Sequence, residues 1–154
     1  MTILARERLI GLPKSTTSVD PIPVRVKVMN NLEFCHSDFD AVRREQVHFL
    51  EVPASVRPGM LRVTLPSFLV DELGLLTSGT SRVVFPDGHC DVWPLVQDLR
   101  LQLCGRDHVF SALVDPVGTE IRIGTMVLDV LDLVIEWPSR HIRPRDPSGI
   151  VIDL

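Results

Sequence analysis

The sequence contains no tyrosine, and all aromatic residues together make up 5% of its 154 positions. Long apolar runs are also missing: stretches such as 73–76 and 126–128 are far shorter than the roughly 20 residues that span a bilayer. The sequence therefore excludes a transmembrane helix. Near the start, Arg6, Glu7 and Arg8 interrupt the apolar stretch that a secretory signal needs to be continuous. We therefore expect a cytoplasmic protein with no membrane partner.

Neither sign of charge is in strong excess, because 16 basic residues stand against 20 acidic ones and the formal net charge is −4. Such a surface creates no field that would gather nucleic acid, so we expect no nucleic-acid partner. Cysteine is scarce as well. The three cysteines are an odd number at wide spacing and cannot complete a disulfide framework, and reduced thiols agree with a cytoplasmic location.

Branched aliphatic residues, in contrast, are abundant, with 21 Val, 20 Leu and 9 Ile. A chain of this length and composition can bury one hydrophobic core and has little room for a second. Strict alternation of apolar and polar residues begins at 22–28, which is typical of a strand with one wet face. We therefore divide the chain into a flexible N-terminal arm (1–21), a barrel domain (22–137) and a C-terminal extension (138–154).

The pattern predicts mostly strands joined by turns. Beyond 22–28, strand composition recurs at 46–52, 61–65, 82–85, 90–96, 99–103, 108–114 and 133–137. Asp87-Gly88 is typical of a type I′ turn in a hairpin, and Gly105 to Asp107 is expected to turn the next hairpin. The sheet is therefore expected to be largely antiparallel. Asn30-Asn31 and residues 35–40 are expected to form a turn-rich connection.

Two short helices interrupt the strands. Residues 66–74 carry apolar side chains at helical spacing and end at Gly74, a typical C-cap, and Thr125 is expected to cap a helix over 126–132. The two passages align without a gap at an offset of 58 residues, as from Leu65 to Ile123. A strand followed by a short helix, used twice, indicates a closed β-barrel built from two similar halves about a pseudo-two-fold axis.

The order of these elements resembles the retropepsin-like family of aspartic proteases, over residues 22–146. Leu65-Pro66 and Leu73-Gly74-Leu75 match the family's Leu-Pro and Leu-Gly-Leu, and the sequence at 123–128 resembles its Leu-Gly-x-x-x-Leu motif. The resemblance implies an all-β fold, a closed retropepsin-like barrel of six to eight strands with two short helices. It also implies a homodimer and a flap hairpin that contains Asp87, Gly88 and His89.

The family's catalytic turn is altered here. Counting back from Leu65 places Arg57-Pro58-Gly59-Met60 where the family has Asp-Thr-Gly-Ala. A guanidinium has no acceptor lone pair and stays protonated, so Arg57 is neither a general base nor a carboxylic acid. Two such groups at a dimer axis would also repel each other. Pro58 lacks the hydroxyl and the N–H of the family's threonine. The resemblance therefore implies no catalytic residue in this turn.

Asp115 is a candidate replacement, because the 58-residue offset makes it the equivalent of Arg57. In the family, however, the second catalytic aspartate comes from the second subunit. We therefore interpret Asp115 as a turn residue before Pro116. Asp71 and Asp129 also match across the repeat, and we expect both on solvated helix faces.

Three pairs of cysteine and histidine could ligate zinc: Cys35-His36, His89-Cys90 and Cys104 with His108. None has the spacing with which one turn presents two ligands, so we expect no metal and no other cofactor. No local signature of a catalytic cysteine–histidine pair is present.

Two features remain near the end of the sequence. The basic run 140–145 is expected to be a solvated connection, and the β-branched residues of 150–154 favour a strand that docks on its own sheet or on a partner.

These observations favour a catalytically inactive relative of the aspartic proteases that binds a peptide or a protein as a homodimer. An active homodimeric endopeptidase with a non-standard turn and a structural subunit of an assembly are the alternatives.

Overall fold

The computed structural model describes residues 20–37 and 49–154. The predicted N-terminal arm lies outside this part except for its last two residues. The first three residues of the strand expected at 46–52 also lie outside it. The strands are β1 (Ile22–Asn30), β2 (Phe49–Val56), β3 (Val63–Pro66), β4 (Thr77–Val84), β5 (Cys90–Leu103), β6 (Arg106–Asp115), β7 (Ile121–Ile123), β8 (Leu133–Glu136) and β9 (His141–Pro144). The helices are α2 (Asn31–Ser37), α4 (Ser67–Leu73) and α5 (Thr125–Leu131).

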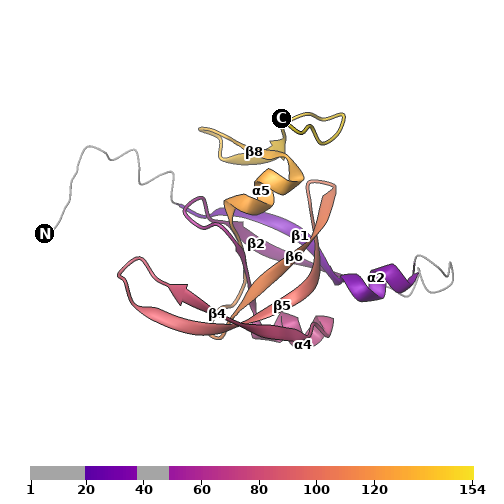
Figure 1. The fold of residues 1–154 in the computed structure, drawn as a ribbon. Coiled ribbons are helices and arrows are strands. Elements are labelled where there is room, and N and C mark those ends of the chain that lie inside the picture. The colour runs from indigo at the N-terminus through magenta and orange to yellow at the C-terminus, as the bar shows by residue number, and fades with distance from the viewer. Residues whose placement is uncertain (1–19, 38–48) are drawn as a thin grey trace, which may run out of the picture.

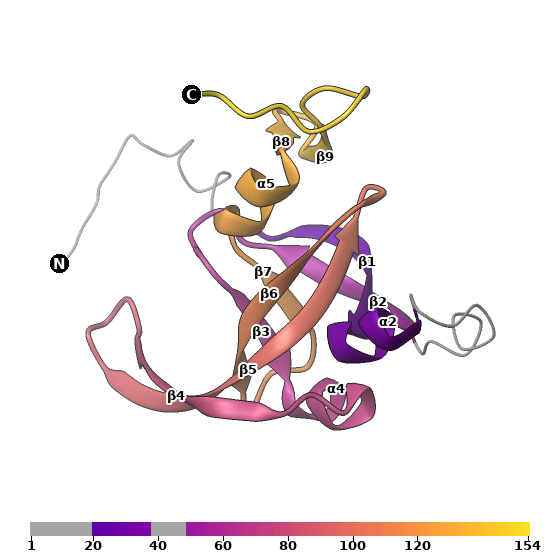
Figure 2. The ribbon, with the colours of Figure 1, turned by 45° about the vertical axis from the view of Figure 1, so that its right-hand side comes forward.

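Six strands close into a barrel in the order β1-β2-β7-β3-β6-β5, and pairing of β5 with β1 completes the ring. The predicted all-β barrel is therefore confirmed. Most pairs are antiparallel, as expected, whereas β2–β7 and β3–β6 are parallel. Strand β4 extends the sheet beyond β5, and this β4–β5 hairpin projects away from the barrel (Figures 1 and 2). None of the helices in the described ranges is long and apolar enough to cross a membrane.

The strand pairing repeats with the 58-residue offset found in the sequence. Ala54 pairs with Ile121 in the first parallel pair, and their equivalents, Ala112 and Val63, pair in the second. The helices α4 and α5 obey the same offset and lie at opposite ends of the barrel (Figure 1). The barrel therefore consists of two similar halves whose strands pair with each other, β2 with β7 and β3 with β6.

The core follows the alternation of the strands. In β5, Leu99, Leu101 and Leu103 are buried while the residues between them are partly exposed. Val63 and Leu65 of β3 are likewise fully buried. Closing the sheet into a barrel turns one face of every strand inward. The apolar residues that alternate along each strand therefore pack together in a single core. Burial of these branched side chains is the main stabilising contribution.

Residues 31–37 form the helix α2, where the sequence analysis expected a turn-rich connection. Asn30 explains the difference. Its Oδ1 accepts a hydrogen bond from the Leu32 N–H (3.0 Å), and its Nδ2 donates to the carbonyls of Leu73 and Gly74 (3.2 Å each). One side chain thus satisfies the start of α2 and the end of α4.

The two hairpin turns differ from their predicted types. In the first, Phe85 and His89 face each other across three residues, Phe85 N–H donates to the His89 carbonyl (2.9 Å), and only Gly88 of this loop has a positive φ, +90°. In the second, Cys104 and Gly105 both have positive φ (54° and 76°). The two-residue type I′ geometry therefore occurs at Cys104-Gly105, and the predicted turn residues Arg106 and Asp107 already belong to β6.

The helix α5 begins one residue earlier than predicted. Gly124 is the N-cap, while Thr125 is the first helical residue and donates from both N and Oγ1 to the Met60 carbonyl (2.9 and 3.3 Å). The prediction of Thr125 as the cap is therefore wrong, because its hydroxyl bonds to the β2–β3 turn instead. Helix α4 matches its prediction, with Gly74 at φ +67° as C-cap.

The C-terminal extension differs from its prediction at residues 141–144 and at residues 150–154. Residues 141–144 form β9, which pairs with β8, so the basic run is part of a hairpin that crosses the expected boundary at 137. Residues 150–154 form no strand, and the strand expected there is wrong. They fold back beside α5 (Figure 2).

Candidate functional site

A cleft of about 520 Å³ lies beside the β4–β5 hairpin. We call residues 77–96 of this hairpin the flap hairpin. It contributes residues 83–86 and Trp93 to the cleft, and the β2–β3 turn contributes residues 59–62. Thr64, Leu113 and Arg122, from β3, β6 and β7, complete the lining. These strands belong to both halves of the barrel, so the cleft exists only once the halves have assembled.

Aromatic contacts brace the tip of the flap hairpin. The Phe85 ring stacks on His89 with 4.5 Å between ring centroids, and it meets Trp93 edge-on at 5.7 Å. The Asp87 carboxylate accepts a hydrogen bond from the His89 N–H (2.9 Å), and Gly88 supplies the positive φ. Asp87, Gly88 and His89 therefore shape the tip without lining the cleft, while Phe85 and Trp93 face it.

Both the guanidinium and the backbone N–H of Arg57 contact other groups of the protein. Its Nε donates to Ser55 Oγ (3.2 Å), and its Nη2 lies 3.5 Å from Glu120 Oε1, while the Ser55 hydroxyl donates to the same carboxylate (3.0 Å). Its backbone N–H donates to the Ile123 carbonyl (2.8 Å). Arg57 therefore ties the β2–β3 turn to the second half of the barrel. Of the four residues of the altered turn, Gly59 and Met60 line the cleft, whereas Arg57 and Pro58 do not.

Asp115 is almost fully buried, at 3% exposure. Its Oδ1 accepts a hydrogen bond from the Val117 N–H (3.0 Å), which closes an Asx turn, and its Oδ2 lies 3.5 Å from Arg122 Nη1. The geometry matches the interpretation of Asp115 as a turn residue. Asp115 does not line the cleft. Asp71 and Asp129 are exposed on their helices, as expected.

Gly124 fixes the β2–β3 turn against α5. A Cβ at this position would lie 2.2 Å from the carbonyl carbon of Leu61, closer than any real side-chain atom approaches backbone. The contact lets Met126 N–H donate to the Leu61 carbonyl (3.1 Å), next to the Thr125 bonds to Met60. One wall of the cleft is therefore held by the start of a helix from the other half.

The sequence analysis missed three polar residues of the cleft: Arg62, Thr64 and Arg122. Thr64 and Arg122 stand opposite each other where β3 meets β7, and they are themselves equivalent by the 58-residue offset. Thr64 Oγ1 and Arg122 Nε are buried without a hydrogen-bond partner. Strand alternation predicts only that these side chains face away from the core. They line a cleft because the flap hairpin forms its opposite wall.

The candidate zinc ligands whose side chains the structure describes do not come together in one group. No group of three or more His, Cys, Asp or Glu side chains that could hold a metal forms within 20–34 and 49–154, and the side chains of Cys35 and His36 lie outside this description. Cys90 is exposed at the flap hairpin. Burial raises the pKa of Cys104 above its ordinary value of 9.0, although Arg106 acts in the opposite direction, and its Sγ lies 3.6 Å from the Ile142 carbonyl oxygen. Cys104 is therefore a protonated thiol at neutral pH.

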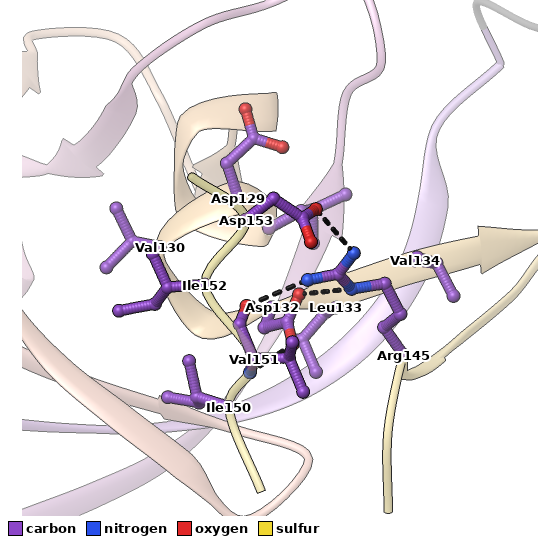
Figure 3. Close-up of a pocket in the computed structure, with 11 residues that line it drawn as sticks. Asp129, Val130, Asp132, Leu133, Val134, Arg145, Ile150, Val151, Ile152 and Asp153 are labelled. Carbon is purple, nitrogen blue, oxygen red and sulfur yellow. Dashed lines mark hydrogen bonds and ion pairs between the residues drawn. The ribbon is translucent and has the colours of Figure 1, made fainter.

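A second pocket, of about 540 Å³, lies between α5, β8 and the C-terminal segment. Figure 3 shows Arg145 between two carboxylates: its Nε lies 2.8 Å from Asp132 Oδ1 and its Nη1 2.8 Å from Asp153 Oδ2. Asp132 Oδ2 also accepts a hydrogen bond from the Val151 N–H (2.8 Å). This bond, followed by the Arg145 contacts, lowers the pKa of Asp132. Residues 150–154, which we call the C-terminal segment, are therefore held by bonds to Asp132 and Arg145.

No protein-family model matches the sequence, and no curated protein matches it significantly.

Proposed function

We propose that this protein is a catalytically inactive relative of the retropepsin-like aspartic proteases that binds a peptide or protein segment in the cleft beneath its flap hairpin. The observation that carries the proposal is the composition of the cleft, which has no aspartate or glutamate among the described residues that line it. The closed barrel with its repeated strand pairing and the hairpin that projects beside the altered turn (Figure 2) support the resemblance.

The absence of hydrolysis follows from the chemistry of the family. An aspartic protease needs two carboxylates that share one proton, so that the ionised one activates water and the protonated one assists the carbonyl. Arg57 can do neither, and it is engaged by Ser55 and Glu120. Asp115 is held by its own turn and by Arg122. The cleft therefore offers no general base to water.

Binding, in contrast, is supported by the walls of the cleft. Met60, Leu61, Val83, Phe85 and Trp93 give it an apolar lining. Strand β4 is the last strand of the seven-stranded sheet, so an extended peptide could pair with its outer edge through main-chain hydrogen bonds, while its side chains enter the apolar cleft. Strand addition beside an apolar cleft suits a peptide ligand better than a small polar metabolite.

The proposal includes the homodimer that the resemblance implies. Two Arg57 guanidinium groups at a dimer axis, about 4 Å apart, would repel by roughly 4 kcal/mol at an effective dielectric constant of about 20. Within each chain, however, the Glu120 carboxylate lies 3.5 Å from Arg57 and offsets much of that charge. The repulsion is therefore smaller than the sequence alone suggests.

The test is a cleavage assay combined with a binding assay on the purified full-length protein. We expect no cleavage of unfolded casein or of a random peptide library between pH 3 and pH 8, and retention of a subset of the library by the immobilised protein. Cleavage that pepstatin inhibits would contradict the proposal and favour an active endopeptidase. Loss of that cleavage in Asp115→Asn, with retention in the exposed control Asp129→Asn, would then assign the catalytic role to Asp115.

A further inference from the structure

The cleft carries positive charge that the protein does not fully neutralise. Arg62 and Arg122 both line it. Arg62 Nη2 donates to Ser111 Oγ (3.0 Å), and no carboxylate in the described part of the chain pairs with Arg62. Arg122 has one carboxylate partner, Asp115, 3.5 Å from its Nη1. With two guanidinium groups and one carboxylate, the site has a surplus of about one positive charge, although the whole protein has a net charge of −4.

Hydrogen-bonding capacity in the same place is also unused. Among the described residues, buried Arg122 Nε has no acceptor, and the buried hydroxyl of Thr64, on the opposing strand, has no partner either. A buried polar group without a partner is destabilising unless something else satisfies it. Both atoms are closed to solvent, so a ligand oxygen would reach them only if neighbouring side chains move.

The remaining lining limits what that ligand can be. Phe85, Trp93 and Val83 of the flap hairpin face the arginines across an apolar space. A surplus of one charge matches a monoanion, and a planar guanidinium pairs with a planar carboxylate through two parallel hydrogen bonds. A phosphate dianion would carry more charge than the site neutralises and would lose more hydration among these apolar side chains.

We propose that the cleft selects peptides in which a carboxylate lies among apolar side chains, with the carboxylate bound by Arg62 and Arg122. This inference rests on the proposed function, since it names the ligand of the same cleft. The carboxylate can come from an aspartate or glutamate side chain or from the C-terminus of a peptide. Both sources offer the same two oxygens to the arginines.

The experiment uses the immobilised full-length protein and two pools of synthetic random octapeptides, one with free and one with amidated C-termini. Bound peptides are identified by mass spectrometry. We expect bound peptides to be apolar and enriched in carboxylate about tenfold over the input, the typical gain from a charge-assisted hydrogen bond. Enrichment of Asp or Glu in both pools assigns the side chain as the source, and binding confined to the free-acid pool assigns the C-terminus.

Arg62→Gln is the principal variant, because among the described residues the Arg62 side chain forms a hydrogen bond only to Ser111, and its loss leaves no buried charge unpaired. We expect it to remove the carboxylate enrichment while apolar peptides still bind. Arg122→Gln should do the same, and its thermal melting is measured because it deprives buried Asp115 of its partner. Arg143→Gln, which removes one positive charge from the distant β9 hairpin, is the matched control and should bind as the native protein does.

The outcomes separate the two proposals. Apolar peptides that bind with no carboxylate preference, or with the same preference in folded Arg62→Gln, overturn the present inference and leave the proposed function standing. If neither pool yields any bound peptide, both proposals fail.

Discussion

At the scale of single residues, the glycine at position 124 has a role that its neighbour in space, Gly59, does not share. A Cβ at Gly124 would overlap the Leu61 backbone at 2.2 Å, whereas a Cβ at Gly59 would meet nothing within 4 Å. Gly124 therefore permits a close approach between the two halves of the barrel. Gly59 belongs to the β2–β3 turn, yet its φ is not in the positive range that requires glycine.

We predict that Gly124→Ala lowers the free energy of unfolding by about 3 kcal/mol, because backbone must move to make room. Gly59→Ala is the matched control and should change it by about 1 kcal/mol or less, with stabilisation possible through reduced freedom of the unfolded chain. Urea unfolding measures both. Equal losses in the two variants would show that α5 does not pack against the β2–β3 turn in this way.

The cysteines provide a second prediction at this scale. Because burial raises the pKa of Cys104 above 9.0, less of it is thiolate at pH 8, and the thiolate is the nucleophile. Cys90 and Cys104 are both exposed residues, and we predict that iodoacetamide modifies Cys104 more slowly than Cys90, as measured by peptide mapping. In urea, where the desolvation of Cys104 is lost, the two rates should converge. A Cys104 that reacts faster than Cys90 in the folded protein would contradict the raised pKa of its thiol.

At the scale of secondary-structure elements, the two helices show how equivalent positions can acquire different roles. The C-caps Gly74 and Asp132 are related by the 58-residue offset, and both have left-handed backbone, at φ +67° and +55°. Glycine adopts this conformation freely, and aspartate is among the few other residues that tolerate it. At Asp132 the side chain adds a function, since it holds Arg145 and Val151 of the C-terminal segment.

The pH dependence of this tether follows from the sign of the shift. The pKa of Asp132 lies below its ordinary value of 3.8 when the segment is bound, so the tether stabilises the bound form fully above pH 3.8. It weakens as pH falls through the lower pKa of the folded form. We predict that the amide signal of Val151 in NMR titrates with a midpoint below pH 3.8. A midpoint above 3.8 would contradict the hydrogen bond.

We also predict that Asp132→Asn loosens the C-terminal segment at neutral pH without unfolding the barrel. Asparagine tolerates the left-handed backbone but cannot pair with Arg145 as a charge. Carboxypeptidase should then remove the last residues faster than from the native protein. Asp129→Asn, an exposed neighbour on α5, should be digested at the native rate.

At the scale of the whole molecule, the position of the C-terminal segment bears on assembly. The sequence left open whether 150–154 dock on the same chain or on a partner, and the bonds from Asp132 and Arg145 to Val151 and Asp153 lie within one chain. A homodimer that used this segment would first have to break these bonds within the chain.

We predict that deletion of residues 150–154 leaves the mass measured by light scattering unchanged. The segment forms no strand and satisfies its bonds within the chain, so its loss opens the pocket beside α5 without removing an intersubunit contact. A fall from dimer to monomer on deletion would show that the segment exchanges between chains.

Features that depend on neighbours along the chain could be predicted from the residues alone. Alternation marked most strands, Gly74 marked the end of α4, and the aligned passages at 65–73 and 123–131 predicted a barrel of two similar halves. Each signal reflects local physics: side-chain direction alternates in a strand, and a positive φ favours glycine.

Features that depend on residues far apart in the sequence became visible only in the folded chain. Asn30 caps α2 while it binds the end of α4, Arg57 pairs with Glu120, and Thr64 meets Arg122 where β3 pairs with β7. Their side chains are ordinary polar residues in their own segments. The cleft forms where the flap hairpin covers strands from both halves, because closing the barrel brings these segments together at a cost in chain entropy that only the buried core repays.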